Sequence, residues 1–518
     1  INYDNKRQSE MILAAFLFSR SSESTTSSRQ SSRVTARFFM AAHLRRKSLL
    51  YYDMLLCAEL VLRFWQDSII INHVCLLFIK AKESYTMRVT FYTLGCKVNQ
   101  NETGALAQLF EENGYTVVSN EEGADVYIVN SCTVTNFGDQ KSRKWLRRAK
   151  RENPGAVTVL TGCYPQAFPD EAAEIAEADV VTGSGNRHAI LTDVQKVLNG
   201  EEERVVDIRP HEKGERFEEL PMDKFAEHTR AFVKVEDGCN RRCAYCVIPR
   251  ARGPVRSRDE TSVLEELRRL ADAGYKEVVL TAISLPSYGT DSGTSLVELI
   301  EKAAEVPGIE RIRLGSLDPD MLHDDDIRRM AAVKKLCPQF HLSLQSGCDK
   351  TLRAMRRPYT TAQYADIAAK LRAAFGADNV SFTTDVIVGF PGETEDDFEA
   401  SMAFVTGMRF LKVHVFPYSR REGTAAYDFA DQLPEHEKEA RSRRMTAAVE
   451  EVRAAEAAAM QGRKASVLLE TPLSATMFTG YTKQYLPVLV SAPGHKTGDI
   501  VEVTLGAWDG KRCRAEIV

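Results

Sequence analysis

From residue 87 onward, the apolar positions predict short buried strands that alternate with amphipathic helices. Runs of β-branched and aromatic residues start at Val89, Val126 and Val157, and helical patterns over 102–113 and 140–151 separate them. Strands that alternate with helices form a parallel sheet, whose carboxyl ends all lie along one edge. We therefore expect an α/β domain over 87–200, with its site at that edge.

The same alternation returns over residues 228–450. The pattern predicts helices over 261–273, 296–304 and 361–375, and six strands over 231–235, 277–281, 311–314, 340–344, 381–388 and 412–416. Six βα units form an open, partial TIM-like barrel, which places chemistry at the carboxyl mouth of its strands. The boundaries that we predict for this domain are 226–454.

The pattern changes at both ends of this second domain. Residues 201–225 are charged and lack periodicity, as in a linker, whereas 435–460 predicts one long helix. Short strands over 465–470, 486–490 and 500–505 are separated by Gly and Pro turns, which is typical of a small OB-like β-barrel. The third domain is therefore expected over 455–518.

Residues 1–86 differ from the rest of the chain. A stretch over 21–32 is rich in Ser, Thr and Arg, as in a targeting peptide, and the apolar run 69–79 is too short to span a bilayer. We interpret 1–86 as a wrongly placed start or upstream translation, with a transit peptide as the alternative. No packed fold is expected there.

The composition indicates the redox environment of the protein and limits how it could bind a nucleic acid. The chain has 518 residues, a formal net charge of −4 and eleven cysteines. A nucleic acid would therefore have to meet local basic patches, since the overall charge does not attract it. Six of the cysteines fall into two triads and do not resemble a disulfide framework, which indicates a reducing, cytoplasmic setting. No membrane partner is expected.

The first triad is a tight loop, Cys239, Cys243 and Cys246, with C-x3-C-x2-C spacing. Three thiolates can hold an iron–sulfur cluster and leave one iron open to a cofactor, whereas a closed zinc site needs four ligands. The alternative is a degenerate zinc knuckle, for which no fourth Cys or His lies close in sequence.

The second triad is spread over the first domain. Cys96, Cys132 and Cys163 follow its three predicted strands at intervals of 36 and 31 residues, about one βα unit each. The common sheet edge would bring them to one place as a second site with three thiolates. The alternative is three unrelated core cysteines. The other cysteines lack such spacing and are interpreted as ordinary thiols: Cys57, Cys75, Cys337, Cys348 and Cys513.

The tight loop, with Tyr245 before its last cysteine, resembles the radical S-adenosylmethionine signature. Together with the motifs around the second triad, the chain from Met87 onward resembles the methylthiotransferase family. The motifs are Leu94-Gly-Cys-Lys-Val-Asn-Gln-Asn-Glu, Asn130-Ser-Cys-Thr-Val, Thr161-Gly-Cys-Tyr-Pro-Gln and Asp385-Val-Ile-Val-Gly-Phe-Pro-Gly-Glu-Thr. The family's architecture is a cluster domain, a radical barrel and a TRAM domain.

Within this family, the chain resembles the branch that acts on threonylcarbamoyladenosine in tRNA. The pointers are Gly95-Cys-Lys-Val-Asn-Gln, Leu342-Ser-Leu-Gln-Ser-Gly-Cys-Asp and Val413-His-Val-Phe-Pro-Tyr-Ser. The branches that act on isopentenyladenosine or on a ribosomal-protein aspartate are alternatives. The chain departs from the family where Ala282 and Pro286 replace two glycines, which puts the cofactor contacts of that loop in doubt.

The resemblance implies two [4Fe-4S] clusters, one on each triad, with S-adenosylmethionine at the open iron of Cys239, Cys243 and Cys246. That cluster would generate a radical, and the other would deliver a methylthio group to C2 of the adenine next to the anticodon. A tRNA anticodon stem-loop and an electron donor such as flavodoxin or ferredoxin are the implied partners. The expected cofactor-binding residues are Tyr245, Gln345, Arg357 and Asp385.

Basic residues near these motifs are candidates for RNA contact. Four lie in one predicted helix, two follow the tight loop and one lies in the small barrel: Arg143, Lys144, Arg147, Arg148, Arg252, Arg256 and Lys464. The alternative for each run is a solvated face. A non-catalytic iron–sulfur or zinc RNA-binding module is the alternative from another functional class.

Overall fold

The computed structural model describes residues 86–120, 122–220, 222 and 229–518. These residues belong to one unit over 83–518. The expectations for residues 1–85 lie outside the described residues. Within the part that is described, no helix has the length and apolar character needed to cross a membrane.

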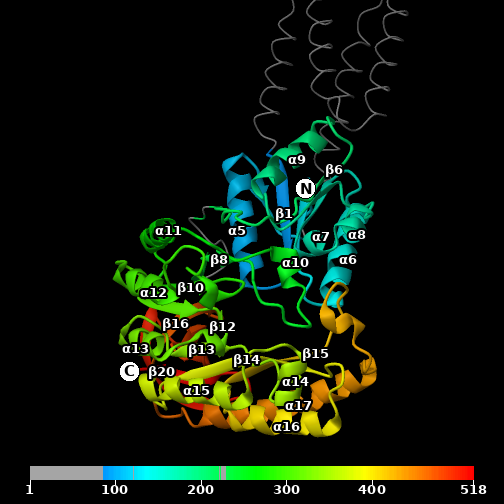
Figure 1. The fold of residues 1–518 in the computed structure, drawn as a ribbon. Coiled ribbons are helices and arrows are strands. Elements are labelled where there is room, and N and C mark those ends of the chain that lie inside the picture. Colours follow the sequence, from blue (N-terminus) through cyan, green and yellow to red (C-terminus); the bar gives the residue numbers. More distant parts are fainter. Residues whose placement is uncertain (1–85, 121, 221, 223–228) are drawn as a thin grey trace, which may run out of the picture. The chain divides into compact units, whose positions relative to one another are not determined.

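The first domain is an α/β layer built on a parallel sheet with the order β2-β1-β3-β4-β5-β6 (Figure 1). The predicted strands are β1 (Arg88–Thr93), β3 (Val126–Ser131) and β4 (Val157–Gly162), and β3 and β4 are buried along their whole length. The main helices are α5 (Lys97–Glu112), α6 (Asn136–Glu152) and α9 (His188–Leu198). The parallel α/β prediction is confirmed.

Three short strands of this sheet were not predicted: β2 (Thr116–Val117), β5 (Val180–Thr182) and β6 (Val205–Asp207). Strand β6 pairs in parallel with β5 and lies inside 201–225, so the expectation of a plain linker there was wrong. Three residues are too few to show an alternating pattern, and the pairing depends on contacts with the rest of the sheet.

The central domain consists of two parallel sheets, with the orders β11-β10-β7 and β12-β13-β14-β15, in which β12 is the short strand Ser316–Leu317. All six predicted strands are present. They are β7 (Arg230–Lys234), β10 (Glu277–Thr281), β11 (Arg311–Leu314), β13 (Gln339–Leu342), β14 (Ser381–Val388) and β15 (Lys412–Pro417). The predicted helices correspond to α11 (Glu260–Asp272), α12 (Leu296–Glu305) and α15 (Thr361–Phe375). One apolar core lies between the strands and these helices.

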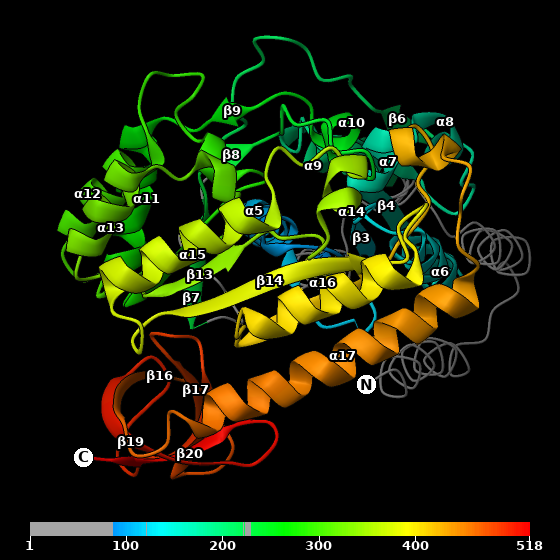
Figure 2. The ribbon, with the colours of Figure 1, turned by 60° about the horizontal axis from the view of Figure 1, so that its bottom comes forward.

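A long helix leads to the third domain. Helix α17 (Glu435–Ala458) packs against α16 (Glu395–Gly407) and β15, and it ends beside a closed five-stranded barrel (Figure 2). The barrel is formed by β16 (Lys464–Pro472), β17 (Met477–Thr482), β18 (Pro487–Ser491), β19 (Ile500–Trp508) and β20 (Cys513–Ile517). Strands β17 and β20 were not predicted, but the small β-barrel was.

Buried arginines of the central domain attach this barrel. Arg313 donates to the carbonyls of Thr482 and Lys483 over 3.3 and 3.1 Å, and Arg311 donates to Ser466 Oγ over 2.8 Å. Glu277 accepts from Arg313 Nε over 2.9 Å and so neutralises the buried cation. Main-chain carbonyls of the barrel and two of its side chains, Ser466 and Glu470, therefore both take part in this interface; Glu470 pairs with Arg230 over 2.7 Å.

The first and central domains meet across a buried ionic cluster. Helix α5 packs against β7, where Asn101 Nδ2 donates to the carbonyl of Phe232 over 2.6 Å. The next residue of α5, Glu102, pairs with Arg187 over 2.8 Å, with Lys234 over 2.7 Å and with Arg252. All four side chains are buried. Burial alone would raise the pKa of Glu102, but the three cations outweigh it and hold this pKa at about 2.

Replacement of Glu102 by Gln should destabilise the protein by about 3–5 kcal/mol, because three buried cations lose their common counter-charge. The stability that Glu102 contributes is present above its ordinary pKa of 4.5 and is lost as the pH falls through about 2. Urea denaturation at pH 7 measures the loss. Glu111→Gln, at an exposed site on the same helix, is the control and should change stability little. Equal stability of the two variants would contradict the role of the ionic cluster.

Candidate active site

The tight cysteine loop lies between β8 (Glu236–Asp237) and the short helix α10 (Ile248–Arg252). The backbone N–H of Cys239 donates to the carbonyl of Gly253 over 3.0 Å, and that of Ala244 to Met355 over 2.9 Å. Gly238 has φ +90°, and a Cβ there would lie 1.9 Å from the carbonyl oxygen of Pro254. Only glycine fits this approach, so the local sequence fixes the start of the loop.

The three thiols of this loop are partly exposed and lie close enough to affect one another. Burial raises the pKa of Cys239 to about 11 and that of Cys246 to about 12, and the neighbouring Cys243 adds to both shifts. A bound metal would displace these protons, since thiolates are the ligating form. Three soft thiolates are the donor set of a four-iron cluster in which one iron has no protein ligand.

Among the described residues, no three His, Cys, Asp or Glu side chains converge on a single metal ion. A zinc site requires such convergence, because its ligands lie about 2.0–2.3 Å from one atom. In a four-iron cluster each thiolate binds a different iron, so the sulfur atoms stand further apart. A structural zinc site takes four protein ligands, whereas this loop supplies three thiols, the number that a four-iron cluster with one open iron takes.

The second triad is brought to one edge of the first sheet. Cys96 precedes α5, Cys132 directly follows β3, and Cys163 begins the short helix α7 (Cys163–Ala167) after β4. A Cβ on Gly95 would lie 3.3 Å from Cys132 Sγ, so the turn before Cys96 packs on Cys132. Burial, and then Cys163, raises the pKa of Cys132 to about 12. This donor set again fits a cluster with three protein ligands.

Helix α10 joins the two sites. It packs against α7, and its residues Val247 and Ala251 share one apolar core with Cys163. The segment directly after the tight loop therefore rests on the element that carries a thiol of the second triad. The two sites are held in a fixed relation by this packing.

Of the four expected cofactor residues, Tyr245 belongs to the tight loop and Arg357 contacts it, whereas Asp385 lies on β14 and Gln345 bonds to that strand. Arg357 donates from Nη1 to Cys243 Sγ over 3.2 Å and from Nε to Tyr359 Oη over 2.9 Å. Tyr245 is partly buried, and burial raises its pKa well above the ordinary value. Asp385, on β14, lies 3.4 Å from His341 Nε2.

Gln345 has a backbone that is unusual for a residue with a side chain. Its φ is +72°, a region that only a few per cent of residues other than glycine occupy. Its N–H donates to the carbonyl of Asp385 over 2.9 Å, and its carbonyl accepts from Ile387 over 2.8 Å. These bonds to β14 hold the uncommon conformation beside the carboxyl end of β13.

Sequence reasoning missed Glu236 as a site residue. Its carboxyl is fully buried; Oε2 accepts from the N–H of Ser284 over 2.9 Å, and Oε1 has no hydrogen-bond partner within the described chain. Burial raises its pKa well above the ordinary value. A buried oxygen with a free lone pair fits a donor group of a bound cofactor. The available signal was the acidic pair directly before the loop.

The departure from the family motif at Ala282 and Pro286 causes no backbone strain. Neither residue has a positive φ, and Pro286 lies in the short 3-10 helix η1 (Leu285–Ser287), where its fixed φ is tolerated. In this loop the left-handed conformation falls on Gly289, with φ +85°. The two substituted positions therefore do not need the conformational freedom of glycine.

The basic RNA candidates divide into exposed and buried groups. Arg252 and Arg256 are 0% and 5% exposed, so the expectation that they contact RNA was wrong. Both are buried because carboxylates of the ionic cluster neutralise them. Lys144 and Lys464 are exposed, and so are Arg147 and Arg148, which form surface ion pairs with Glu177 and Glu152. Arg143 is half-buried and donates to Tyr164 Oη over 2.7 Å.

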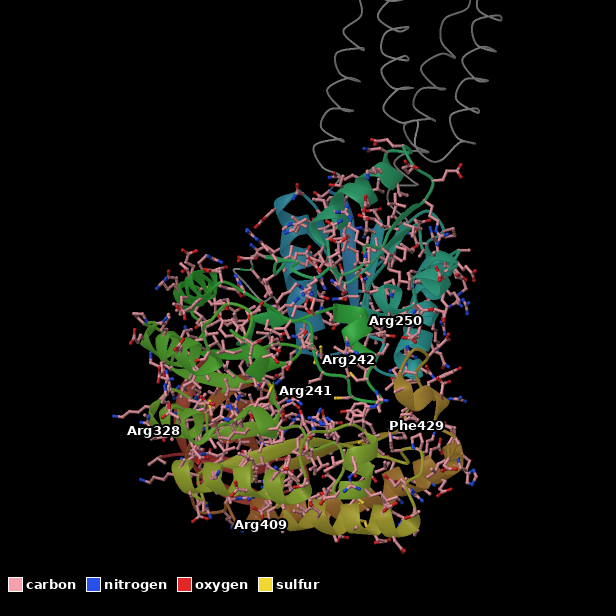
Figure 3. All side chains as sticks on the ribbon, viewed as in Figure 1. Arg241, Arg242, Arg250, Arg328, Arg409 and Phe429 are labelled. Atoms are coloured by element: carbon pink, nitrogen blue, oxygen red, sulfur yellow. The ribbon has the colours of Figure 1, made fainter. Side chains whose placement is uncertain are left out.

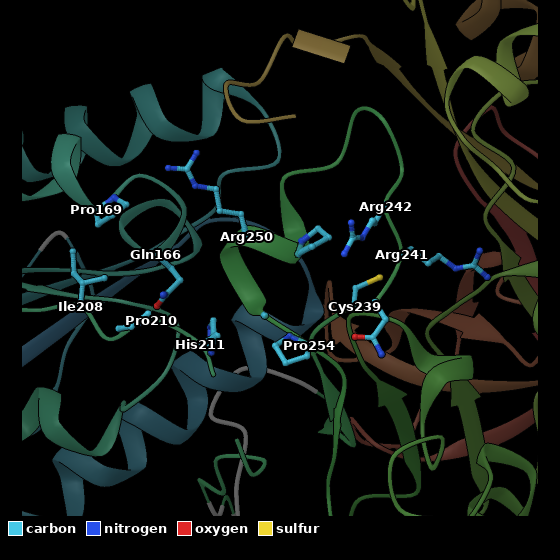
Figure 4. Close-up of a pocket in the computed structure, with 13 residues that line it drawn as sticks. Gln166, Pro169, Ile208, Pro210, His211, Cys239, Arg241, Arg242, Arg250 and Pro254 are labelled. Carbon is cyan, nitrogen blue, oxygen red and sulfur yellow. The ribbon is translucent and has the colours of Figure 1, made fainter. Parts of the chain in front are cut away.

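A cavity of about 740 Å³ opens beside the tight loop (Figure 4). Gln166 and His211 line it from the first domain, and Cys239, Arg242 and Arg250 line it from the loop and α10. Arg241, Arg242 and Arg250 all lie in the central region where these elements meet (Figure 3). The cavity therefore gives access to the cysteine loop from a positively charged side.

Family models match both halves of the site. The model described as the radical SAM superfamily matches residues 233–405, and the one described as uncharacterized protein family UPF0004 matches residues 88–183. The first range contains the tight loop, and the second contains all three cysteines of the other triad.

Curated relatives cover nearly the whole of this unit. The threonylcarbamoyladenosine tRNA methylthiotransferase MtaB of Bacillus subtilis is 39% identical over 80% of this chain and 93% of its own length. MtaB of Aquifex aeolicus is 41% identical over 69% of this chain and 86% of its own length. The tRNA-2-methylthio-N(6)-dimethylallyladenosine synthase of Akkermansia muciniphila is 34% identical over 80% and 95%. Because these relatives are 34–41% identical over most of their own length, the chain belongs to the radical S-adenosylmethionine tRNA methylthiotransferase family.

Proposed function

We propose that this enzyme adds a methylthio group to C2 of N6-threonylcarbamoyladenosine in tRNA, at the adenosine next to the anticodon. The observation that carries the proposal is the presence of two three-thiol sites joined through α10 in one rigidly packed unit. The substrate follows from the relatives, because the two MtaB proteins are 39% and 41% identical and the dimethylallyladenosine synthase is 34% identical.

The enzyme uses S-adenosylmethionine and [4Fe-4S] clusters. We propose that Cys239, Cys243 and Cys246 hold the cluster that binds S-adenosylmethionine, and that the other triad holds the cluster that carries sulfur. When bound, these groups supply the radical chemistry that an unactivated C–H bond on adenine requires, since side-chain acids and bases cannot break it. Arg357, Tyr245, Gln345 and Asp385 would position the cofactor, and Glu236 would accept one of its donor groups.

The anticodon loop would approach a surface beside both sites. Phe137, near the start of α6, is 63% exposed, and Phe416, near the end of β15, is 43% exposed. Asn136 links the two segments, because it bonds to Ser419 Oγ over 3.2 Å and to the Arg420 carbonyl over 3.1 Å. Exposed aromatic rings are the platforms on which unpaired RNA bases stack.

A lysine side chain lies beside the exposed ring of Phe137. Lys141 Nζ lies 4.5 Å from the centroid of the Phe137 ring, and Lys144 lies on the same helix. Their positive charges suit the phosphates that flank a splayed base.

Because the proposed substrate is tRNA, we place the reaction in the cytoplasm. For the electron that the radical cluster needs, we propose a small acidic donor such as flavodoxin or ferredoxin, which the exposed Arg242 and Arg250 beside Cys239 would suit.

Deletion of the gene should abolish 2-methylthio-N6-threonylcarbamoyladenosine in tRNA and leave its unmethylthiolated precursor to accumulate. Nucleoside mass spectrometry of digested tRNA, with and without a restoring copy, measures both species. Loss of the 2-methylthio isopentenyl nucleoside instead would support the dimethylallyladenosine branch. Unchanged tRNA nucleosides would contradict both tRNA substrates.

The two triads should have separable roles. Cys243→Ala should keep iron on the first domain and abolish formation of 5′-deoxyadenosine, whereas Ala at Cys96, Cys132 and Cys163 together should keep that cleavage and lose the methylthio product. Chromatography of 5′-deoxyadenosine and of the nucleosides measures both, after a check of solubility. Cys348→Ala, away from both triads, is the control. Undiminished cleavage in Cys243→Ala would refute the assignment of the loop.

Phe137→Ala should raise the KM for tRNA roughly tenfold, because stacking of a base on an aromatic ring contributes about 1–3 kcal/mol. Cleavage of S-adenosylmethionine without tRNA should not change. Steady-state kinetics with an anticodon stem-loop RNA tests this, with Val206→Ala as an exposed apolar control from the far strand β6. An unchanged KM would remove Phe137 from the RNA surface.

A further inference from the structure

Arg252 connects the tight loop with the second triad through direct contacts. It is the last residue of α10, the helix that starts two residues after Cys246, and its side chain is fully buried against the first domain. Sequence position alone assigns it to the radical loop. Its contacts place its guanidinium at the other site.

The guanidinium of Arg252 bonds to a thiol of the second triad. Nε donates to Cys163 Sγ over 3.1 Å, and Nη2 donates to Asn99 Oδ1 over 3.2 Å. The same Asn99 oxygen lies 3.4 Å from Cys96 Sγ and accepts its hydrogen bond. One side chain thus touches one thiol directly and a second thiol through one amide.

The remaining nitrogens of Arg252 are held by carboxylates. Nη2 donates to Glu102 Oε2 over 3.0 Å, Nη1 also pairs with Glu102, and Nη1 lies 3.3 Å from Asp237 Oδ2. Asp237 is two residues before Cys239, so the guanidinium is fixed from both domains. A guanidinium held by carboxylates on its other nitrogens cannot rotate toward another partner. Its Nε bond to the Cys163 sulfur is therefore preorganised.

Arg187 provides a contrast within the same ionic cluster. It is 2% exposed and pairs with Glu102 over 2.8 Å and with Glu218 over 2.8 Å. It shares the burial and the main counter-charge of Arg252, but none of its hydrogen bonds or ion pairs in the described part of the chain involves a cysteine.

We propose that Arg252 is a positioning residue that donates a charge-assisted hydrogen bond to the Cys163 thiolate and thereby raises the reduction potential of the cluster on the second triad. Hydrogen bonds and positive charge at the ligand sulfurs stabilise the more electron-rich, reduced cluster. The inference rests on the cluster assignment under Proposed function. It adds that the radical domain itself supplies the group that tunes the sulfur-carrying cluster.

The test uses full-length protein in which Cys239, Cys243 and Cys246 are Ala, so that a single cluster remains after anaerobic reconstitution. A redox titration followed by electron paramagnetic resonance gives its midpoint potential. With Arg252→Gln, the ratio of reduced to oxidised cluster at a fixed potential should fall about tenfold, which is 59 mV for one electron. Arg187→Gln is the matched control and should shift the ratio clearly less.

Arg252→Lys keeps a positive charge near Glu102 but loses the Nε donor, and it should shift the ratio in the same direction by a smaller amount. This variant decides the question if Arg252→Gln does not fold. Equal shifts for Arg252→Gln and Arg187→Gln, or no shift for Arg252→Lys, would overturn the inference. If the protein with the three Cys→Ala substitutions and its native Arg252 binds no cluster, the assignment of a cluster to the second triad fails. The inference about Arg252 then fails for that separate reason.

Discussion

The pairing of Glu102 with buried cations is the constraint on which the arrangement of this protein depends. Charges removed from water are tolerated only when their partners are in place, so the first and central domains can dock in only one register. Glu102 comes from α5, Lys234 from β7 and Arg252 from α10. Because α5 starts directly after Cys96 and α10 soon follows Cys246, docking these charges also fixes the two thiol sites relative to each other.

The same constraint shapes the surface that would meet RNA. Arg252 and Arg256, which follow the cysteine loop, are buried, whereas exposed cations lie on α6 and, as Arg242 and Arg250, around the cavity beside Cys239. Exposed aromatic rings at the ends of α6 and β15 add a surface on which a base can stack. The cations proposed for RNA contact, Lys141 and Lys144, are therefore different from the buried arginines that dock the domains.

A different set of contacts attaches the small barrel to the central domain. Arg311 and Arg313 reach from β11 to main-chain carbonyls of residues 481–483, and Glu277 neutralises them. Two side chains of the barrel add to this attachment, because Ser466 accepts from Arg311 and Glu470 pairs with Arg230. Strand β16 of this closed barrel begins with the exposed Lys464.

The sequence by itself determined the three-domain order, the parallel strands and both cysteine triads. These features are local, since buried strands show as apolar runs and cysteines after strand ends must meet at one sheet edge. Tertiary structure alone decided that β6 joins the first sheet, that Arg252 and Arg256 are buried, and that Arg252 bonds to Cys163. Arginine is normally exposed, and its burial depends on carboxylates far away in the chain. No local pattern in the sequence encodes that pairing.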